Sequence, residues 1–475
     1  MILQKSNCLL EYFSSIKFSG KFLQNAAAIS INLAQLVTGF TVGWSSPIFP
    51  LLISDQTPLA DGPISVDEAS WITSVYYLGG CVGCVVFGRL PDYIGRKWTI
   101  VFAGIPHICA YILTVVARNG TYLLISRALS GIASNVLFIV VPMFISEIAE
   151  SKNRGKIGSW SGIFITLGIA LGYLIGTFFH MKVGGSFCLV ILGFFLLTTP
   201  FFPETPPYLL MKKREDESFK TLMFYRGFRK NDVVSEGFLK EFEGLKTMIV
   251  NASQKGSVGF KDFKPSSTRK AILICFILYL GRVCCGLFQM EGYGGTVLNE
   301  AGSGIGGNIS TIVSAVSVHI LSYVSMMLIE RIGRRKMMLF STFGSGIFSG
   351  IVSIMIWLRK NGIDTSSVNW LPTLAYTGYS VIAVYGIIVL PMIISTEILP
   401  IKIKSLILLC MFLMSNILTA VSVTYFMTIA DFFGFYFNIG MFSFSCFLEF
   451  TILYFLLPET KGKSFDEIVK VLQWK

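Results

Sequence analysis

Long apolar stretches separated by short polar ones run through most of the chain. The hydrocarbon core of a membrane is about 30 Å thick, and a helix of about 20 apolar residues spans it. The sequence predicts an all-α membrane protein with twelve transmembrane helices. The apolar stretches lie near residues 26–52, 70–88, 98–117, 121–147, 157–180, 184–202, 270–299, 308–329, 337–358, 371–398, 405–430 and 434–457.

The composition agrees with this reading. Of the 475 residues, 53% are hydrophobic and 14% are charged, whereas a soluble domain carries about 25% charged residues. No nucleophile–base pairing and no metal-ligand spacing stands out, so we expect neither an enzyme nor a cofactor or metal site.

Basic residues fall in alternate polar segments, as the positive-inside rule expects. We therefore place both termini in the cytoplasm and read the first helix as an uncleaved anchor, in what we expect to be the plasma membrane. This topology explains the net charge of +12, so we expect no nucleic-acid partner. The expected partner of the apolar surface is the lipid bilayer. Six of the 39 lysine and arginine residues lie outside the cytoplasmic segments: Arg118, Arg127, Lys182, Arg282, Arg359 and Lys360.

Two sequence motifs mark a duplication. The loop GRLPDYIGRK (residues 88–97) has a copy, LIERIGRRK (328–336), and PETPP (203–207) has a copy, PETKGK (458–463). SEIAESKNRG is likewise matched by TEILPIKIKS. A long internal repeat of this kind predicts two pseudo-symmetric six-helix halves around a central site.

We expect five regions along the chain. Phe238, Phe242, Leu245 and Ile249 recur at helical spacing between charged residues, which predicts amphipathic helices in the linker. The regions are a cytoplasmic N-terminus (1–25), a first half (26–210), a cytoplasmic linker (211–270), a second half (271–457) and a cytoplasmic tail (458–475).

The paired motifs resemble the sugar porter branch of the major facilitator superfamily, the glucose-transporter-like proteins. Within this branch, GWSSP and EASW are similar to insect facilitated trehalose transporters. The resemblance implies an inner gate in which Glu147 and Glu397 pair with arginines of the facing half and latch the outward-open state. The expected gate residues are Asp92, Arg96, Glu147, Arg154, Glu330, Arg334, Arg335, Glu397 and Lys404.

The sugar-binding positions of the family match this chain poorly. Gly162, Arg282 and Val283 stand where the family has glutamines, Phe288 stands for an asparagine and Met392 for a tryptophan. Sugar hydroxyls need convergent donors and acceptors. The solute-binding candidates are Gln35, Thr166, Arg282, Gln289, Met392 and Asn416.

Arg282 is the most unusual of these candidates. Counting from Ala271 at about 1.5 Å per residue puts it roughly 16 Å deep, where a charge needs water, a partner or a solute. Glu291 falls on the opposite face of a regular helix, so we do not expect a simple ion pair. Arg282 either caps carbonyls freed near Gly292 or points into the central cavity, toward a different polyol or an anionic solute.

Three functions remain open. The first is facilitative transport of a sugar, trehalose or a hexose, by alternating access. The second is proton-coupled sugar transport; the resemblance disfavours it, because Ser45 stands where symporters have an aspartate, although Glu291 and Glu449 remain as intramembrane acids. The third is a sugar receptor that no longer transports. The sequence does not indicate an oligomeric state.

Two glycosylation sequons, at Asn119 and Asn308, fall in expected outer loops.

Overall fold

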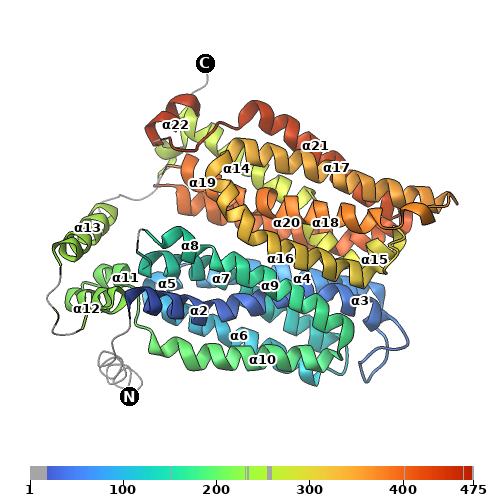
Figure 1. Ribbon diagram of the computed structural model, residues 1–475, viewed down its shortest axis with the longest axis horizontal. Helices are drawn as coiled ribbons and strands as arrows, with labels where there is room; N and C mark the ends of the chain where they lie inside the picture. Colours follow the sequence, from blue (N-terminus) through green and yellow to red (C-terminus); the bar gives the residue numbers. More distant parts are fainter. Residues whose placement is uncertain are drawn as a thin grey trace.

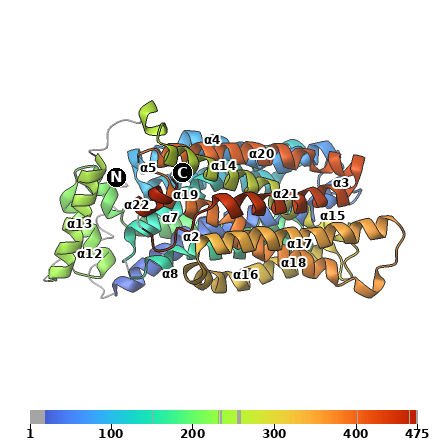
Figure 2. The same ribbon diagram turned by 90° about the horizontal axis from the view of Figure 1, so that it is seen from above.

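The twelve expected helices form two bundles. The computed structural model describes residues 19–150, 152–229, 232, 235–253, 259–400, 402–463 and 465–472. Within these residues, twelve helices are long and apolar enough to cross a membrane. Figure 1 shows a first half, blue to green, beside a second half, yellow to red, and Figure 2 shows the same bundle from above. The predicted all-α fold with twelve spans is confirmed.

Each half supplies six spans, some of them broken into shorter helices. The first half contains α2 (Gly20–Gly43), α3 (Ser45–Ile53), α4 (Val66–Phe87), α5 (Leu90–Ile94), α6 (Arg96–Val116), α7 (Gly120–Ile148), α8 (Arg154–Gly158), α9 (Trp160–Phe178), α10 (Met181–Thr198) and η1 (Thr199–Phe201). The second half contains α14 (Ser266–Cys284), α15 (Leu287–Glu300), α16 (Gly307–Ile332), α17 (Arg334–Lys360), η3 (Ser366–Val368), α18 (Leu371–Ala383), the π-helical turn η4 (Val384–Ile388), α19 (Leu390–Ile398), α20 (Lys404–Phe433) and α21 (Phe435–Leu456).

Several spans begin earlier than the apolar pattern indicates, among them α2 and α14. α2 starts at Gly20, because the Ser19 hydroxyl accepts the Phe22 backbone N–H at 3.2 Å and caps the helix before its apolar part begins. α14 starts at Ser266 rather than near Ala271, with a polar first turn that follows Pro265. Hydropathy marks only the membrane-embedded part of a helix, so polar first turns escape it.

The linker helices α11 (Pro206–Met211), α12 (Glu215–Arg226) and α13 (Glu236–Ser253) fold under the first half, whereas the short η2 (Phe260–Phe263) packs on α14 of the second half. As the spacing predicted, Phe238 and Phe242 are buried, here against Leu222 and Met223 of α12. Arg226 donates to the Ile148 carbonyl at 2.9 Å and fixes α12 to the end of α7.

The tail helix α22 (Phe465–Leu472) lies at the same end of the bundle as the linker helices (Figure 1), and it packs on α14 and α19. We call this end the linker end and the opposite one the far end.

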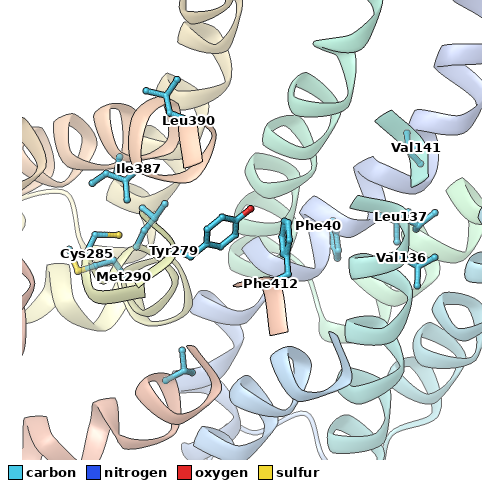
Figure 3. Close-up of a cluster of buried hydrophobic side chains, with 14 of the residues drawn as sticks. Phe40, Val136, Leu137, Val141, Tyr279, Cys285, Met290, Ile387, Leu390 and Phe412 are labelled. Carbon is cyan, nitrogen blue, oxygen red and sulfur yellow. The ribbon is translucent and has the colours of Figure 1, made fainter. Parts of the chain in front are cut away.

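Buried aromatic and aliphatic side chains of both halves form one large cluster. In Figure 3, Tyr279 and Phe412 of the second half lie side by side within a cluster of buried hydrophobic side chains that also includes Phe40 and Leu137 of the first half. The rings of Tyr279 and Phe412 are 5.4 Å apart between centroids, with their planes at 69°. This geometry is typical of edge-to-face aromatic packing.

Glycines let α2 and α9 approach closely. A Cβ at Gly168 would overlap the carbonyl of Leu36, and one at Gly39 would overlap the carbonyl of Ile165. Small residues at such crossings allow backbone-to-backbone packing in membranes, where hydrophobic burial does not favour one interface over another.

We predict that Gly168→Val lowers the stability of the first half, because over-packing costs about 1–3 kcal/mol. Gly193→Val on α10 is the matched control, since a Cβ there meets nothing within 4 Å. Thermal unfolding of the purified variants in detergent measures the difference. Equal midpoints for the two variants would contradict the close α2–α9 contact.

Candidate functional site

A cavity lies between the two halves, at the level where broken helices face each other. About 180 Å³ of it is accessible to the centres of water molecules. One water needs roughly 10–15 Å³ of such space, so the cavity holds on the order of a dozen waters or one small polar solute. Transporters with two repeated halves place their solute at this position.

The cavity lining is mostly hydroxyl, amide and aromatic groups. The first half contributes Thr38, Val42, Tyr76, Tyr77, Ser134, Asn135, Phe138, Ile165, Thr166, Ile169 and Tyr173. The second half contributes Arg282, Leu287, Phe288, Glu291, Thr311, Ser314, Ala315, Val318, Tyr376, Ser380, Val384, Ile388, Phe412, Ser415, Asn416 and Thr419.

The seventh span is broken at Gly286, which separates α14 from α15. Gly286 has φ +81°, in the left-handed region that glycine adopts without strain, and a Cβ there would overlap the ring of Phe442. The Tyr379 hydroxyl donates to the Cys285 carbonyl at 2.7 Å. A tyrosine from α18 therefore satisfies a carbonyl at the break.

A second irregularity follows within α15, at Tyr293 with φ −123°. Here the Tyr376 hydroxyl donates to the Met290 carbonyl and the Tyr173 hydroxyl to the Glu291 carbonyl, both at 2.8 Å. Tyr173 belongs to the first half, so this kink is held from both halves.

These breaks correct the placement of Glu291. We expected it on the opposite face from Arg282, which holds for a regular helix. Because the helix turns at Gly286, both side chains line the same cavity. The two groups form no ion pair within 4 Å of each other in the described part of the chain.

Arg282 lies in the cavity wall between two rings. Its guanidinium carbon is 5.3 Å from the ring centroid of Phe288 and 5.6 Å from that of Phe412. Its buried Nε has no hydrogen-bond partner among the described residues. The carbonyls near the break are instead bonded by tyrosines, so capping them is not the role that the structure gives to Arg282.

Two other sequence candidates, Thr166 and Asn416, also line the cavity. The Thr166 hydroxyl is 3.1 Å from His319 Nδ1 on α16, and the Asn416 amide donates to the Asn135 side-chain oxygen at 3.3 Å. Each bond joins the two halves at the cavity wall.

Gln35, Gln289 and Met392 do not line the cavity, which corrects the sequence analysis. The Gln35 amide donates to the Leu137 carbonyl at 3.0 Å, and the Gln289 amide donates to the Ser422 hydroxyl. Met392 is half-buried in α19, outside the lining. Polar type alone did not reveal which face of each helix points inward.

The sequence analysis missed the tyrosines of the lining. Tyr76, Tyr77, Tyr173 and Tyr376 all line the cavity. No motif distinguishes them from the other tyrosines of the apolar stretches. On α7, the adjacent polar residues Ser134 and Asn135 interrupt an apolar run, and this could have marked them as lining residues.

The halves meet at the far end of the bundle, beside the cavity. The backbone N–H of Gly295 donates to the Ser46 hydroxyl at 2.9 Å, and the rings of Phe49 and Tyr293 are 4.8 Å apart between centroids. These contacts join α3 to α15, the outer pieces of the first and seventh spans.

At the linker end, the expected charged residues pair within each half. Arg96 Nε donates to Glu147 at 3.1 Å, and Arg96 also pairs with Asp92 at 3.3 Å. In the second half, Arg334 pairs with Glu397 at 3.2 Å. In this conformation each glutamate pairs with an arginine of its own repeat, and the expected pairs between facing halves, which belong to the outward-open state, stay a prediction.

The remaining gate candidates have other surroundings. The Arg335 guanidinium donates to the Tyr454 carbonyl at 2.7 Å. Arg154 is exposed at the start of α8, and Lys404 begins α20. Glu330 belongs to α16, but its side chain lies outside the described residues.

Glutamates of the repeated PET motif hold both charged loops. Glu204 accepts the backbone N–H groups of Arg96 and Lys97 at 3.1 Å, and Glu459 accepts that of Arg334 at 3.0 Å. Burial raises the pKa of Glu204. Burial also acts to raise the pKa of Glu459, but backbone N–H bonds outweigh it and the net pKa is lowered.

The two sequon asparagines lie at the far end. The Asn119 amide donates to Asp61 at 3.0 Å, just before α7. Asn308 lies in the first turn of α16 instead of a loop, with its amide oxygen beside Gly295. The first sequon is in a connecting segment as expected, and the second is not.

Two repeated six-helix halves around a solute-sized cavity define a membrane transporter of the major facilitator fold. The family model described as "Sugar (and other) transporter" matches residues 60–472, so the chain belongs to that family, the sugar porters of the major facilitator superfamily.

Among its relatives are facilitated trehalose transporters named Tret1. The Aedes aegypti protein is 28% identical over 448 residues, covering 94% of this chain and 54% of its own length. The Polypedilum vanderplanki protein is 27% identical over 460 residues, which cover 94% of this chain and 87% of that protein. The chain thus spans about half the length of several relatives that it matches.

Solved structures share the fold. The inward-open conformation of the xylose transporter XylE from E. coli matches with a TM-score of 0.75 at 16% identity, over 94% of this chain and 99% of that one. The proton:xylose symporter XylE bound to 6-bromo-6-deoxy-D-glucose matches with a TM-score of 0.72 at 15% identity, over 96% and 100%.

We predict that Glu147→Gln destabilises the protein more than the equivalent Glu397→Gln. The Arg96 side chain is 6% exposed and that of Arg334 is 21% exposed. Breaking a buried pair costs on the order of 3 kcal/mol, and the loss is smaller where water reaches the pair, as it does at Arg334 and Glu397. Thermal unfolding in detergent measures both losses, and a larger loss for Glu397→Gln would refute the burial argument.

Proposed function

We propose that this protein carries a sugar, trehalose or a hexose, across the plasma membrane by facilitated transport with alternating access. The observation that carries the proposal is the solute-sized cavity between the two halves, lined by hydroxyl and amide groups from both. Sugar hydroxyls bind such groups through hydrogen bonds. Membership of the sugar transporter family and the trehalose-transporting relatives support the same solute class.

Alternating access requires the cavity to face one side of the membrane at a time. The α3–α15 contacts of Ser46 and Phe49 join the halves at the far end. At the linker end, the ion pairs of Arg96 and Arg334 stay within their own halves. We propose that this conformation is closed at the far end, and that opening there separates α3 from α15.

The mode of transport that we propose is uniport. The Arg127 guanidinium donates to the Thr41 carbonyl at 2.6 Å and to the Ser45 hydroxyl, and it lies 5.5 Å from the Trp44 ring centroid. Among the described residues no acid pairs with it. Proton coupling needs a titrating carboxylate in the transport path, and this position supplies none.

A proton-coupled symporter is the second candidate, because Glu291 places one carboxyl group in the cavity lining. A structural neighbour is described as a proton:xylose symporter.

We predict that purified protein in vesicles equilibrates labelled trehalose or glucose and does not concentrate it when only a pH gradient is imposed. Vesicles treated with a protonophore are the control and should behave identically. Uphill accumulation that the protonophore abolishes would establish symport instead. Saturable binding of the sugar without any flux would instead support a sugar receptor that does not transport.

For orientation, we propose that the linker end is cytoplasmic, with both termini. We predict that a membrane-impermeant maleimide labels Ala60→Cys on intact cells and does not label Glu236→Cys until the cells are permeabilised. Both positions are exposed, the first in the far-end segment after α3 and the second at the start of α13. The background should lack the exposed native thiols Cys109 and Cys410. The reverse labelling pattern would invert the topology.

A further inference from the structure

The cavity carries two opposite charges, both from the seventh span. Among the described residues that line it, Arg282 and Glu291 are charged and all the others are neutral. Arg282 ends α14 on one side of the Gly286 break, and Glu291 lies in α15 on the other side. The backbone around Glu291 is anchored by the hydroxyls of Tyr173 and Tyr376, so its side chain starts from a fixed point on the wall.

Both charged groups keep free hydrogen-bonding capacity. In the described part of the chain, the Arg282 guanidinium makes no hydrogen bond or ion pair, only contacts with the faces of Phe288 and Phe412. The Glu291 carboxylate likewise has no hydrogen-bond or ion-pair partner there. An arginine offers five donors and a carboxylate offers about four acceptor positions. Together they can donate to and accept from the hydroxyls of a solute.

Other buried charges nearby do not take part. Arg127 is held by Thr41 and Ser45, away from the lining. The Glu449 carboxyl packs against Gly281 and does not line the cavity. With both groups ionised, the net charge of the cavity wall is zero, and the positive and the negative group are not in contact.

From this arrangement we infer that Arg282 and Glu291 jointly set the charge selectivity of the cavity: it accepts a neutral polyhydroxy solute and rejects singly charged ones. Arg282 donates to solute hydroxyls and Glu291 accepts from them. An anionic solute places a second negative charge near Glu291, and a cationic solute places a second positive charge near Arg282. An uncompensated charge is costly in a largely buried cavity. The inference rests on the proposed sugar transport and narrows its solute class.

The test is competition against uptake of a labelled neutral sugar, with D-glucose, D-glucuronate and protonated D-glucosamine as competitors of nearly equal size. On wild type, both charged sugars should compete at least about tenfold less well than glucose, which corresponds to about 1.4 kcal/mol. Arg282→Gln leaves the wall negative and should favour glucosamine over glucuronate. Glu291→Gln leaves it positive and should favour glucuronate. The double variant should restore the wild-type order of preference.

Matched controls lie on the same two helices. Arg269→Gln, at an exposed position in the first turn of α14, and Glu300→Gln, at the exposed end of α15, change the same charges away from the cavity. Neither should alter the order of competitors. An unchanged order in both cavity variants, or equal changes in the controls, overturns the inference.

Two measurements test the inference even if a cavity variant fails to fold. The first is competition on wild type: the inference is contradicted if glucuronate or glucosamine competes as well as glucose. Thermal stabilisation of the purified protein by the same three sugars reads out binding without flux. Wild type that binds in the expected order but shows no uptake refutes transport and retains the charge selectivity. Uptake of neutral sugars with no discrimination against the charged ones refutes only the charge selectivity.

Discussion

Every backbone polar group inside a hydrocarbon layer needs a partner within the protein, and this constraint governs the centre of the molecule. A helix can break there only where side chains satisfy the freed carbonyls. Tyr379, Tyr376 and Tyr173 do this for Cys285, Met290 and Glu291. Each break also turns the chain, so the hydrogen bonds that permit the break also aim the cavity side chains.

The duplicated loops show a different use of backbone N–H groups. Glu204 and Glu459 each accept hydrogen bonds at the start of a helix that follows a positive-φ glycine, Gly95 or Gly333. Negative groups are favoured at helix N-termini, where free N–H groups gather. Because these bonds and the arginine–glutamate pairs close within one repeat, each half is internally tied at the linker end and can move as a unit.

Near the cavity, the halves contact each other through weaker interactions than the ion pairs of the linker end. They include neutral hydrogen bonds such as Asn135–Asn416 and Thr166–His319. A neutral hydrogen bond contributes only about 0.5–1.5 kcal/mol net, since water or solute can replace the partner. Such bonds can be exchanged as the halves move, which suits a protein that must populate two conformations of similar free energy.

Hydropathy, the repeated motifs and the alternation of basic segments were enough to predict twelve spans, two halves and a helical linker. These properties follow from local composition and spacing, because a membrane span needs only length and apolarity. The tertiary structure decided which polar side chains share the cavity. Gln35 and Gln289 turn away to bond Leu137 and Ser422, whereas four tyrosines without a sequence signature turn inward. In a regular helix, Arg282 and Glu291 would lie on opposite faces. The break at Gly286 rotates α15 relative to α14, so both side chains reach the same cavity. Counting residues along the sequence assumes an unbroken helix and cannot show this.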